Sequence, residues 1–479
     1  MLAGTEQVVV FMSDDQAGDD IKLAELLARI PMRECLLVLA VVVFVAARLE
    51  WFFTVPGHDR ASGYFAVRAL RGVDLGQTVY RDFSFEYPPL AWWLTAMPRW
   101  IDSRTYSDTS AAPEEVARFR DWYFGWFNFE LFAADVVCFL LLFFIGGTIS
   151  PTARWALPTA YAVMTAVQPW FLYETLDIGL AMFFLLAIAA WLKAQSDSSP
   201  LGLWGIAAYV FLGLGISFKI MPVVFVPFLL LADWRAGLGW GQLATRVAVL
   251  TAAAAGPFLL HYALAGPGVF ELFRYHGERG INIESTWGAI VLVLRWFGFP
   301  CEVVESHWAF DVVSPVTDAF KTLSSVLPPA MLAAAIVWAW RQGTGFSRRL
   351  AMDTAILVLV NAAVLSHVYC LYYAFWLMPL ALLLAWNTFS RSDLVWGAFA
   401  LLVIVQLAIS SWLYPWHYQF GLISLEPVPV ALSVIRGACL AGMAALLDWQ
   451  FFAAYRRHRP ATSAWPSGAT ATAISSAEG

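Results

Sequence analysis

Charged residues are scarce in this 479-residue chain: Asp, Glu, Lys and Arg together make up 13% of it, and hydrophobic residues make up 60%. In an average soluble domain about a quarter of the residues are charged and about half are apolar. The shortage of charge excludes an ordinary soluble protein and predicts a polytopic membrane protein. The net charge of −6 is less informative than where the charges lie along the chain.

Cysteine is also sparse, and its spacing excludes two kinds of site. There are five cysteines, with no CxxC pair among them, so neither a disulfide framework nor a cysteine-ligated metal site is expected. His58, His276 and Glu278 are too scattered to predict another metal site, so no metal is assigned. The first apolar run, 35–53, starts late and lacks a cleavage pattern, so it is expected to be a retained span.

Long apolar runs are abundant. Twelve are long enough to be read as membrane spans of ~20 residues each, which places both termini on one side. The sequence therefore predicts an all-α polytopic membrane protein. The runs are 35–53, 121–146, 154–171, 175–193, 202–217, 219–233, 244–263, 327–340, 350–368, 372–388, 394–413 and 430–453.

The distribution of basic residues orients these spans. With the N-terminus inside, the inner connections hold most of the Lys and Arg residues, whereas Lys219 is the only basic residue in a short outer connection. This is the positive-inside asymmetry. It leaves two large extracytoplasmic loops, 54–120 and 264–325, both expected to carry interfacial helices. The expected divisions are a cytoplasmic segment 1–34, a membrane domain 35–455 and a basic, then disordered, cytoplasmic tail 456–479.

The first outer loop begins with an amphipathic pattern. From residue 60 to 72, Arg60, Tyr64, Arg68 and Arg71 fall on one helical face and apolar residues on the other. Such a helix is expected to lie in the membrane interface, with its arginines towards lipid phosphate. An aromatic-proline turn, 85–90, follows and leads into a short helix over 91–97.

These residues resemble a known family. Asp59, Tyr64, Ala69-Leu70-Arg71-Gly72, Val79-Tyr80 and Phe85-x-Tyr87-Pro88-Pro89-Leu90 are similar to the first outer loop of the C-type glycosyltransferases. Within that superfamily they are most similar to the family-87 polyprenyl-phosphate-sugar enzymes, which include mannosyl- and arabinofuranosyltransferases. Residues 213–222 and 275–285 also resemble family segments, as does Asp177. At Ser366-His367-Val368-Tyr369 the chain departs from the Ser-Pro-Gln-Tyr pattern that relatives often show.

The resemblance implies inverting transfer of a sugar from a polyprenyl-phosphate donor to an acceptor hydroxyl on a glycolipid or glycan. Transfer is expected at the extracytoplasmic face of the plasma membrane, with no cofactor. A phosphate leaving group needs charge stabilisation rather than protonation, so one carboxylate acting on the acceptor suffices. Asp59 is the candidate base. The simpler interpretation is that Asp59 caps the helix that follows it.

The same resemblance suggests substrate-binding residues. Lys219, His276 and Arg279 are candidates for the donor phosphate, because fixed cations stabilise developing negative charge. Snorkelling of Lys219 and solvation of the two loop residues are the alternatives. The other candidates are Tyr64, Arg68, Glu86, Tyr87 and Asp177, for which packing, bulk-lipid binding by Arg68 and helix capping by Asp177 are the alternatives.

Two other classes of protein stay open. A transporter or flippase of lipid-linked sugars would gather polar groups near the bilayer midplane, whereas here the acids and bases cluster at the outer rim. An oligosaccharide ligase of related topology is a third possibility. The expected partners are a polyprenyl-phosphate sugar, a lipid or glycan acceptor and membrane lipids, with no nucleic acid. Asp135, inside the second span, would cost ~2.5–3.5 kcal/mol if exposed to lipid, so interhelical hydrogen bonding is expected.

Overall fold

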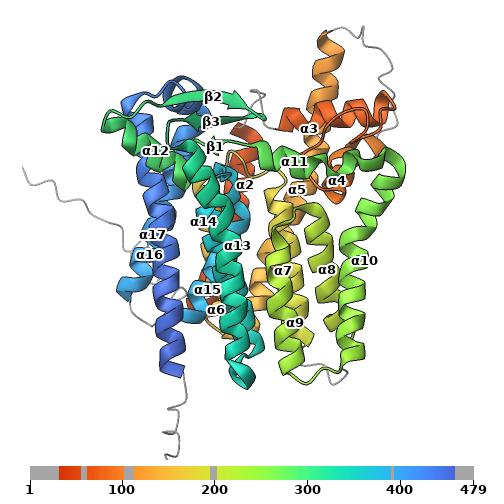
Figure 1. Ribbon diagram of the computed structural model, residues 1–479, viewed down its shortest axis with the longest axis vertical. Helices are drawn as coiled ribbons and strands as arrows, with labels where there is room; N and C mark the ends of the chain where they lie inside the picture. The colour runs from red at the N-terminus through yellow and green to blue at the C-terminus, as the bar shows by residue number, and fades with distance from the viewer. Residues whose placement is uncertain (1–31, 55–61, 102–112, 195–201, 390–392, 459–479) are drawn as a thin grey trace, which may run out of the picture.

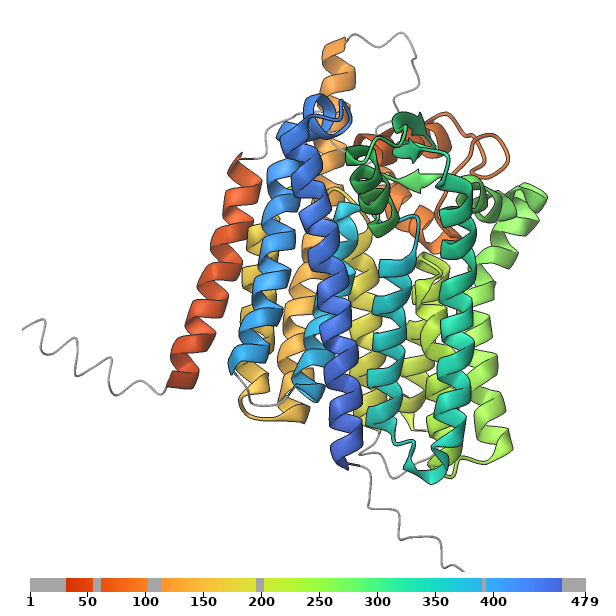
Figure 2. The ribbon, with the colours of Figure 1, turned by 60° about the vertical axis from the view of Figure 1, so that its left-hand side comes forward.

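The computed structural model describes residues 32–54, 62–101, 113–194, 202–389 and 393–458, and these are mostly helical. Long helices run side by side in one bundle (Figure 1). The start of α2 and the end of α17 lie at the same end of this bundle (Figure 2). Helices α3, α11 and α12 and a small sheet cover the opposite end (Figure 1). That end, called the outer end below, carries both large loops.

The elements follow one another in a simple order. The helices of the first half are α2 (Met32–Thr54), α3 (Ser62–Ala69), η1 (Leu70–Asp74), α4 (Pro89–Ile101), α5 (Pro113–Ile149), α6 (Ala153–Val167), α7 (Asp177–Lys193), α8 (Leu203–Phe218), η3 (Met221–Phe225), α9 (Val226–Arg235) and α10 (Trp240–Ala265). The second half contains η4 (Gly266–Phe270), α11 (Glu271–Glu278), β1 (Ile281–Asn282), α12 (Thr286–Trp296), β2 (Glu302–Ser306), β3 (Ala309–Val313), α13 (Thr317–Arg341), η5 (Gly343–Gly345), α14 (Arg348–Leu365), η6 (Leu371–Tyr373), α15 (Ala374–Thr388), α16 (Asp393–Trp412), η7 (Leu413–Leu422) and α17 (Pro427–His458).

Each of the twelve apolar runs overlaps at least one helix. Among the described residues, six helical segments are long and apolar enough to cross a membrane, so the chain is an integral membrane protein. Twelve crossings stay a prediction. The run 219–233 is not one helix: Lys219 has extended backbone, and the short η3 precedes α9. Pro222 and Pro227 explain the break, because proline cannot donate a backbone hydrogen bond.

The second outer loop contains a small sheet that the all-α prediction missed. Strand β3 pairs antiparallel with both β1 and β2, in the order β1-β3-β2. The paired segments 302–306 and 309–313 are rich in valine, which favours a pleated, half-buried surface. The sheet lies across the outer end of the bundle, and its β2–β3 hairpin extends towards α3 (Figure 1).

The core of the bundle is built on helices that are apolar on all sides. Helix α15 is buried along almost its whole length, and Trp376 on it is completely enclosed. Helix α7 is similarly buried, with Trp191 near its inner end. A helix without a polar face is stable only when neighbours surround it. These two helices therefore form the central packing layer against which the outer-end elements are placed.

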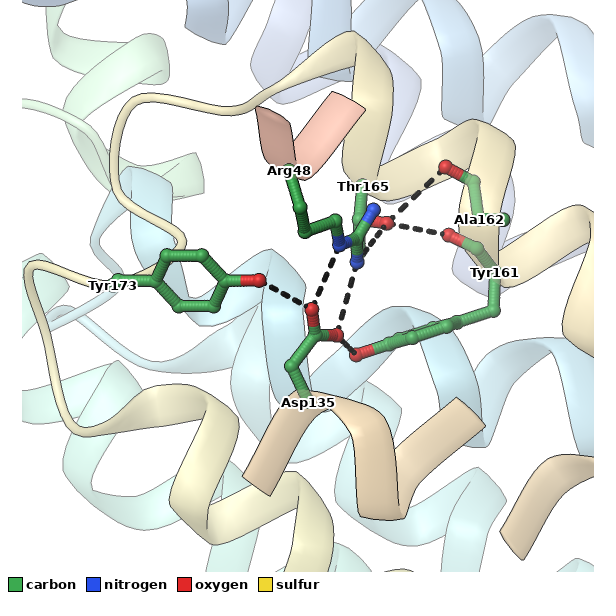
Figure 3. A network of polar contacts seen from close by, with 6 residues as sticks. All are labelled: Arg48, Asp135, Tyr161, Ala162, Thr165 and Tyr173. Atoms are coloured by element: carbon green, nitrogen blue, oxygen red, sulfur yellow. Dashed lines mark hydrogen bonds and ion pairs between the residues drawn. The ribbon is translucent and has the colours of Figure 1, made fainter. Parts of the chain in front are cut away.

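A buried ionic network joins α2, α5 and α6 (Figure 3). Asp135 accepts hydrogen bonds from Arg48 Nε at 2.8 Å, from Arg48 Nη2 at 3.0 Å, and from the Tyr161 and Tyr173 hydroxyls at 2.6 Å each. Arg48 Nη2 also donates to Thr165 Oγ1 at 2.9 Å. The interhelical role expected for Asp135 is confirmed. Because Tyr173 lies between α6 and α7, the network also fixes the connection that leads to Asp177.

We expect Asp135→Leu to destabilise the protein by about 3–5 kcal/mol, because it leaves the Arg48 guanidinium buried without a counter-charge. Replacing both partners, as Arg48→Met with Asp135→Leu, should recover most of that loss. Thermal unfolding of the purified protein in detergent measures both effects. Equal destabilisation by the single and double variants would show that the ion pair is not what Asp135 contributes.

Candidate functional site

A cavity of about 370 Å³ lies at the outer end, where both large loops meet the bundle. We call it the inner cavity. Its walls come from the 86–88 segment, the start of η3, α11, the β2–β3 turn and the 366–373 segment. Among the described residues that line it, most polar side chains are basic or phenolic, and Glu86 is the one carboxylate. The titratable and hydroxyl side chains that line it are Glu86, Tyr87, Lys219, Tyr275, His276, Arg279, His307, Ser366, His367, Tyr372 and Tyr373.

Lys219 enters this cavity from the C-terminal end of α8. Its Nζ lies 2.8 Å from Oδ1 of Asp177, which is the first residue of α7 and fully buried. The two residues can meet because α7 and α8 approach closely at Gly179, where a Cβ atom would lie 2.9 Å from the Phe218 ring. Lys219 therefore carries a fixed positive charge whose counter-charge comes from the neighbouring helix.

Aromatic rings complete the surroundings of Lys219. Its Nζ lies 4.2 Å from the ring centroid of Tyr373, 5.8 Å from that of Tyr87 and 6.0 Å from that of Tyr372. Ring faces attract a cation, so the three tyrosines hold the ammonium group in place. The Glu284 carboxylate accepts a hydrogen bond from the Leu371 amide at 2.5 Å, which anchors the segment that presents Tyr372 and Tyr373.

Arg279 provides a second fixed cation. It is 6% exposed, it lines the inner cavity, and its Nε has no hydrogen-bond partner among the described residues. Its position is set by the sheet, because the Gly280 amide donates to Asp311 Oδ2 on β3 at 3.0 Å. The guanidinium is thus held at the cavity while its Nε–H can still donate a hydrogen bond to a ligand, as an anion-binding group requires.

A second cavity, of about 450 Å³, adjoins the first and is lined mainly by α3 and the 86–87 segment. We call it the outer cavity. Tyr64 donates a hydrogen bond to Glu86 Oε2, and the Arg68 guanidinium stacks 4.3 Å from the Tyr64 ring centroid. Burial raises the pKa of the Glu86 carboxyl above its usual value. Burial and the neighbouring Glu86 also raise the pKa of Tyr64, which keeps its hydroxyl as a donor.

An apolar groove of about 370 Å³ lies between α4, α5, α7 and α8. Three segments that form the site continue into it: Leu90 follows Pro88, Gly179 follows Asp177, and Phe218 precedes Lys219. Leucine, methionine, tryptophan and phenylalanine side chains make up most of its walls, with Glu130 as the one acidic residue. Short stretches of chain therefore connect the lining of the groove to the cationic site.

The structure places the predicted binding residues around these two cavities. The predicted residues that line the inner cavity are Glu86, Tyr87, Lys219, His276 and Arg279. Those that line the outer cavity are Tyr64, Arg68, Glu86 and Tyr87. Asp177 pairs with Lys219. His276 Nε2 lies 3.1 Å from the Glu86 carbonyl oxygen. Asp59 lies outside the described residues. That these side chains bind substrate stays a prediction.

The bulk-lipid interpretation of Arg68 is wrong. Arg68 is 8% exposed, and its Nε donates to the Ser84 carbonyl at 3.2 Å. Arg71 donates to Gln77 Oε1 at 2.7 Å and to the Asp82 carbonyl at 3.2 Å. The 77–86 segment folds over this arginine face, because its carbonyl groups satisfy the guanidinium donors. The two side chains thus hold the first outer loop together.

Several residues at the site were not identified by the sequence analysis. Tyr372 and Tyr373 are two of the tyrosines that surround Lys219. The only sign of this role in the sequence is an aromatic pair at the start of an expected span. His367 lines the inner cavity, and burial lowers its pKa to about 4, so its imidazole is neutral at pH 7. Trp308 lines both cavities from the β2–β3 turn. Among the described residues no cluster of three or more metal-ligating side chains is present.

Comparisons with known proteins give little. No protein-family model matches the chain, and no curated protein matches it in sequence. A solved structure of ArnT from Cupriavidus metallidurans, bound to undecaprenyl phosphate, shares 19% sequence identity with it. The alignment covers 86% of this chain and 77% of that one, with a TM-score of 0.35. A likeness at this level does not establish a shared activity.

Proposed function

We propose that the protein is a membrane glycosyltransferase that moves a sugar from a polyprenyl-phosphate donor to an acceptor hydroxyl at the outer end of the bundle. The observation that carries the proposal is that segments lining the cationic inner cavity continue directly into the lining of the apolar groove, as Pro88 does into Leu90 and Lys219 does from Phe218. Lys219 and Arg279 supply positive charge at the inner cavity, and the groove, whose lining includes Phe218 next to Lys219 in the sequence, is lined mainly by apolar side chains. An anionic headgroup on a long apolar tail matches both parts.

The chemistry follows from where the charges lie. When the bond between the sugar and the phosphate breaks, negative charge grows on the departing phosphate, and preorganised cations stabilise it without protonation. The acceptor hydroxyl must lose a proton, which requires a base on the acceptor side. We assign that role to Asp59, as the family resemblance implies. Asp59 stands three residues before Ser62, and Gly63 and Tyr64 line the outer cavity.

We assign a different substrate to each of the two cavities. The inner cavity holds the donor phosphate and its sugar, and the outer cavity, beside Tyr64, Arg68 and Glu86, receives the acceptor. Because both cavities share Glu86, Tyr87, Trp308 and Tyr372, substrates bound in them would meet at this shared wall. Inversion at the anomeric carbon is the expected outcome of such a direct displacement.

The purified protein in nanodiscs, incubated with a panel of polyprenyl-phosphate sugars and a mixture of glycan and glycolipid acceptors, tests this proposal. At least one donor should be consumed, with release of polyprenyl phosphate and formation of a product of inverted configuration. A flippase of lipid-linked sugars, the alternative function, would move such lipids across a liposome membrane without cleaving them. Translocation with every donor left intact would therefore replace the transferase proposal.

A further inference from the structure

The turn between β2 and β3 carries an exposed tryptophan at an unusual place. Ser306 pairs with Ala309, so His307 and Trp308 alone form the turn. Both have positive φ angles, 53° and 57°. Two-residue turns of this kind favour Asn-Gly, because glycine has no Cβ and asparagine tolerates the left-handed region, where the Cβ of most other residues is crowded against the backbone. A histidine and a tryptophan here cost the fold free energy, and such a cost calls for a functional reason.

The turn is nevertheless firmly held. The His307 carbonyl accepts a hydrogen bond from the Tyr275 hydroxyl, and Ser306 Oγ lies 2.6 Å from His307 Nδ1. His307 Nε2 also lies 4.0 Å from the Glu278 carboxylate. The contacts of Trp308 are with α3: its ring centroid lies 6.0 Å from that of Tyr64 in an edge-to-face arrangement, and 5.8 Å from the Arg68 guanidinium carbon. These contacts tie the indole to α3, and the Arg68 guanidinium lies over one face of its ring.

Despite these contacts, 71% of Trp308 is exposed. It lines both cavities, together with Glu86, Tyr87 and Tyr372. Other exposed tryptophans near the outer end, such as Trp296 at the end of α12, line neither cavity. Tryptophans at helix ends are usual membrane-interface anchors. Trp308 instead lies in a turn, is largely exposed and lines both cavities.

We propose that Trp308 is a stacking platform for a saccharide ring of the acceptor, so that the acceptor is a glycan or a glycolipid headgroup rather than a lipid hydroxyl alone. One face of a sugar ring consists of C–H groups, which pack against the negative face of an aromatic ring. The hydroxyl groups at its rim then meet the polar side chains at the cavity wall, among them Glu86 and Tyr64. The inference rests on the proposed function and specifies its acceptor.

Direct binding tests this without requiring a donor. Wild-type protein in nanodiscs is titrated with methyl glycosides and short oligosaccharides by saturation-transfer NMR. Trp308→Gly suits the backbone of the turn better than tryptophan, so the fold is expected to survive. It should weaken saccharide binding by about tenfold, which is the size of one aromatic contact. Trp308→Phe should retain most of the affinity, and Trp296→Ala should leave it unchanged.

Three results would overturn the proposal: equal affinity in wild type and Trp308→Gly, no binding of any saccharide by the wild type, or an equal loss in Trp296→Ala, which would indicate interfacial anchoring. Polyprenyl phosphate binding is measured on the same samples, and Trp296→Ala should leave it unchanged. A wild type that binds saccharides through Trp308 but does not bind polyprenyl phosphate would contradict the proposed donor while supporting this inference.

Discussion

Asp59→Asn is expected to lower sugar transfer from a polyprenyl-phosphate donor by about 10²–10⁴-fold, which is the usual contribution of a positioned general base. The amide has the shape of the carboxylate but cannot accept the proton of the acceptor hydroxyl. Binding of polyprenyl phosphate should be unchanged, because the phosphate is assigned to cations elsewhere. Turnover of the purified variant, measured with saturating donor, tests the expectation.

A matched control is available in the same loop. Asp82 is an exposed carboxylate that pairs with Arg81 and accepts a hydrogen bond from the Thr78 amide. Asp82→Asn removes the same charge without touching either cavity, so transfer should proceed at close to the wild-type rate. If Asp59→Asn kept full turnover, or if Asp82→Asn lost as much, Asp59 could not be the base.

The second large effect is expected at Lys219. Lys219→Met combined with Asp177→Asn should reduce the affinity for polyprenyl phosphate by about 100-fold, because a desolvated cation facing an anion contributes several kcal/mol. The two changes are combined because removing Lys219 alone would leave Asp177 buried and unpaired. Native mass spectrometry or binding of a fluorescent polyprenyl phosphate analogue measures the loss.

Arg274 is the matched cation for this experiment. It lies on α11, 67% of its side chain is exposed, and it pairs with Glu271 and Glu278 outside the inner cavity. Arg274→Gln should bind polyprenyl phosphate as the wild type does. The assignment fails if the Lys219 and Asp177 double variant retains its affinity, or if Arg274→Gln loses as much.

The sequence predicted the helices well, for a simple physical reason. Apolar runs of membrane length have little alternative to helix, because backbone groups in lipid must be satisfied within the segment. It predicted less well where prolines intervene: 219–233 became η3 and α9. It also missed the β2–β3 hairpin, because the turn residues His307 and Trp308 are not among the residue pairs, such as Asn-Gly, that indicate a two-residue turn. This failure coincides with the residue that we assign to acceptor binding, as expected where function overrides local preference.

The site was predictable only in part. Lys219 stood out as the lone basic residue of a short outer connection, and the aromatic-proline turn 85–90 drew attention to Glu86 and Tyr87. However, the tyrosines that surround Lys219 include Tyr372 and Tyr373, which are about 150 residues away in the sequence. Such pairings are set by which helices pack together, and no local pattern encodes them. The same holds for Arg48, whose role became visible only beside Asp135 in the structure.

The most direct test is an experimental structure of the protein in a nanodisc with polyprenyl phosphate bound. We expect the phosphate oxygens to lie within hydrogen-bond distance of Lys219 Nζ and the Arg279 guanidinium, and the tail to follow the groove past Leu90, Gly179 and Phe218. A phosphate bound elsewhere, with Lys219 still paired only to Asp177 and the groove empty, would contradict the proposed donor site.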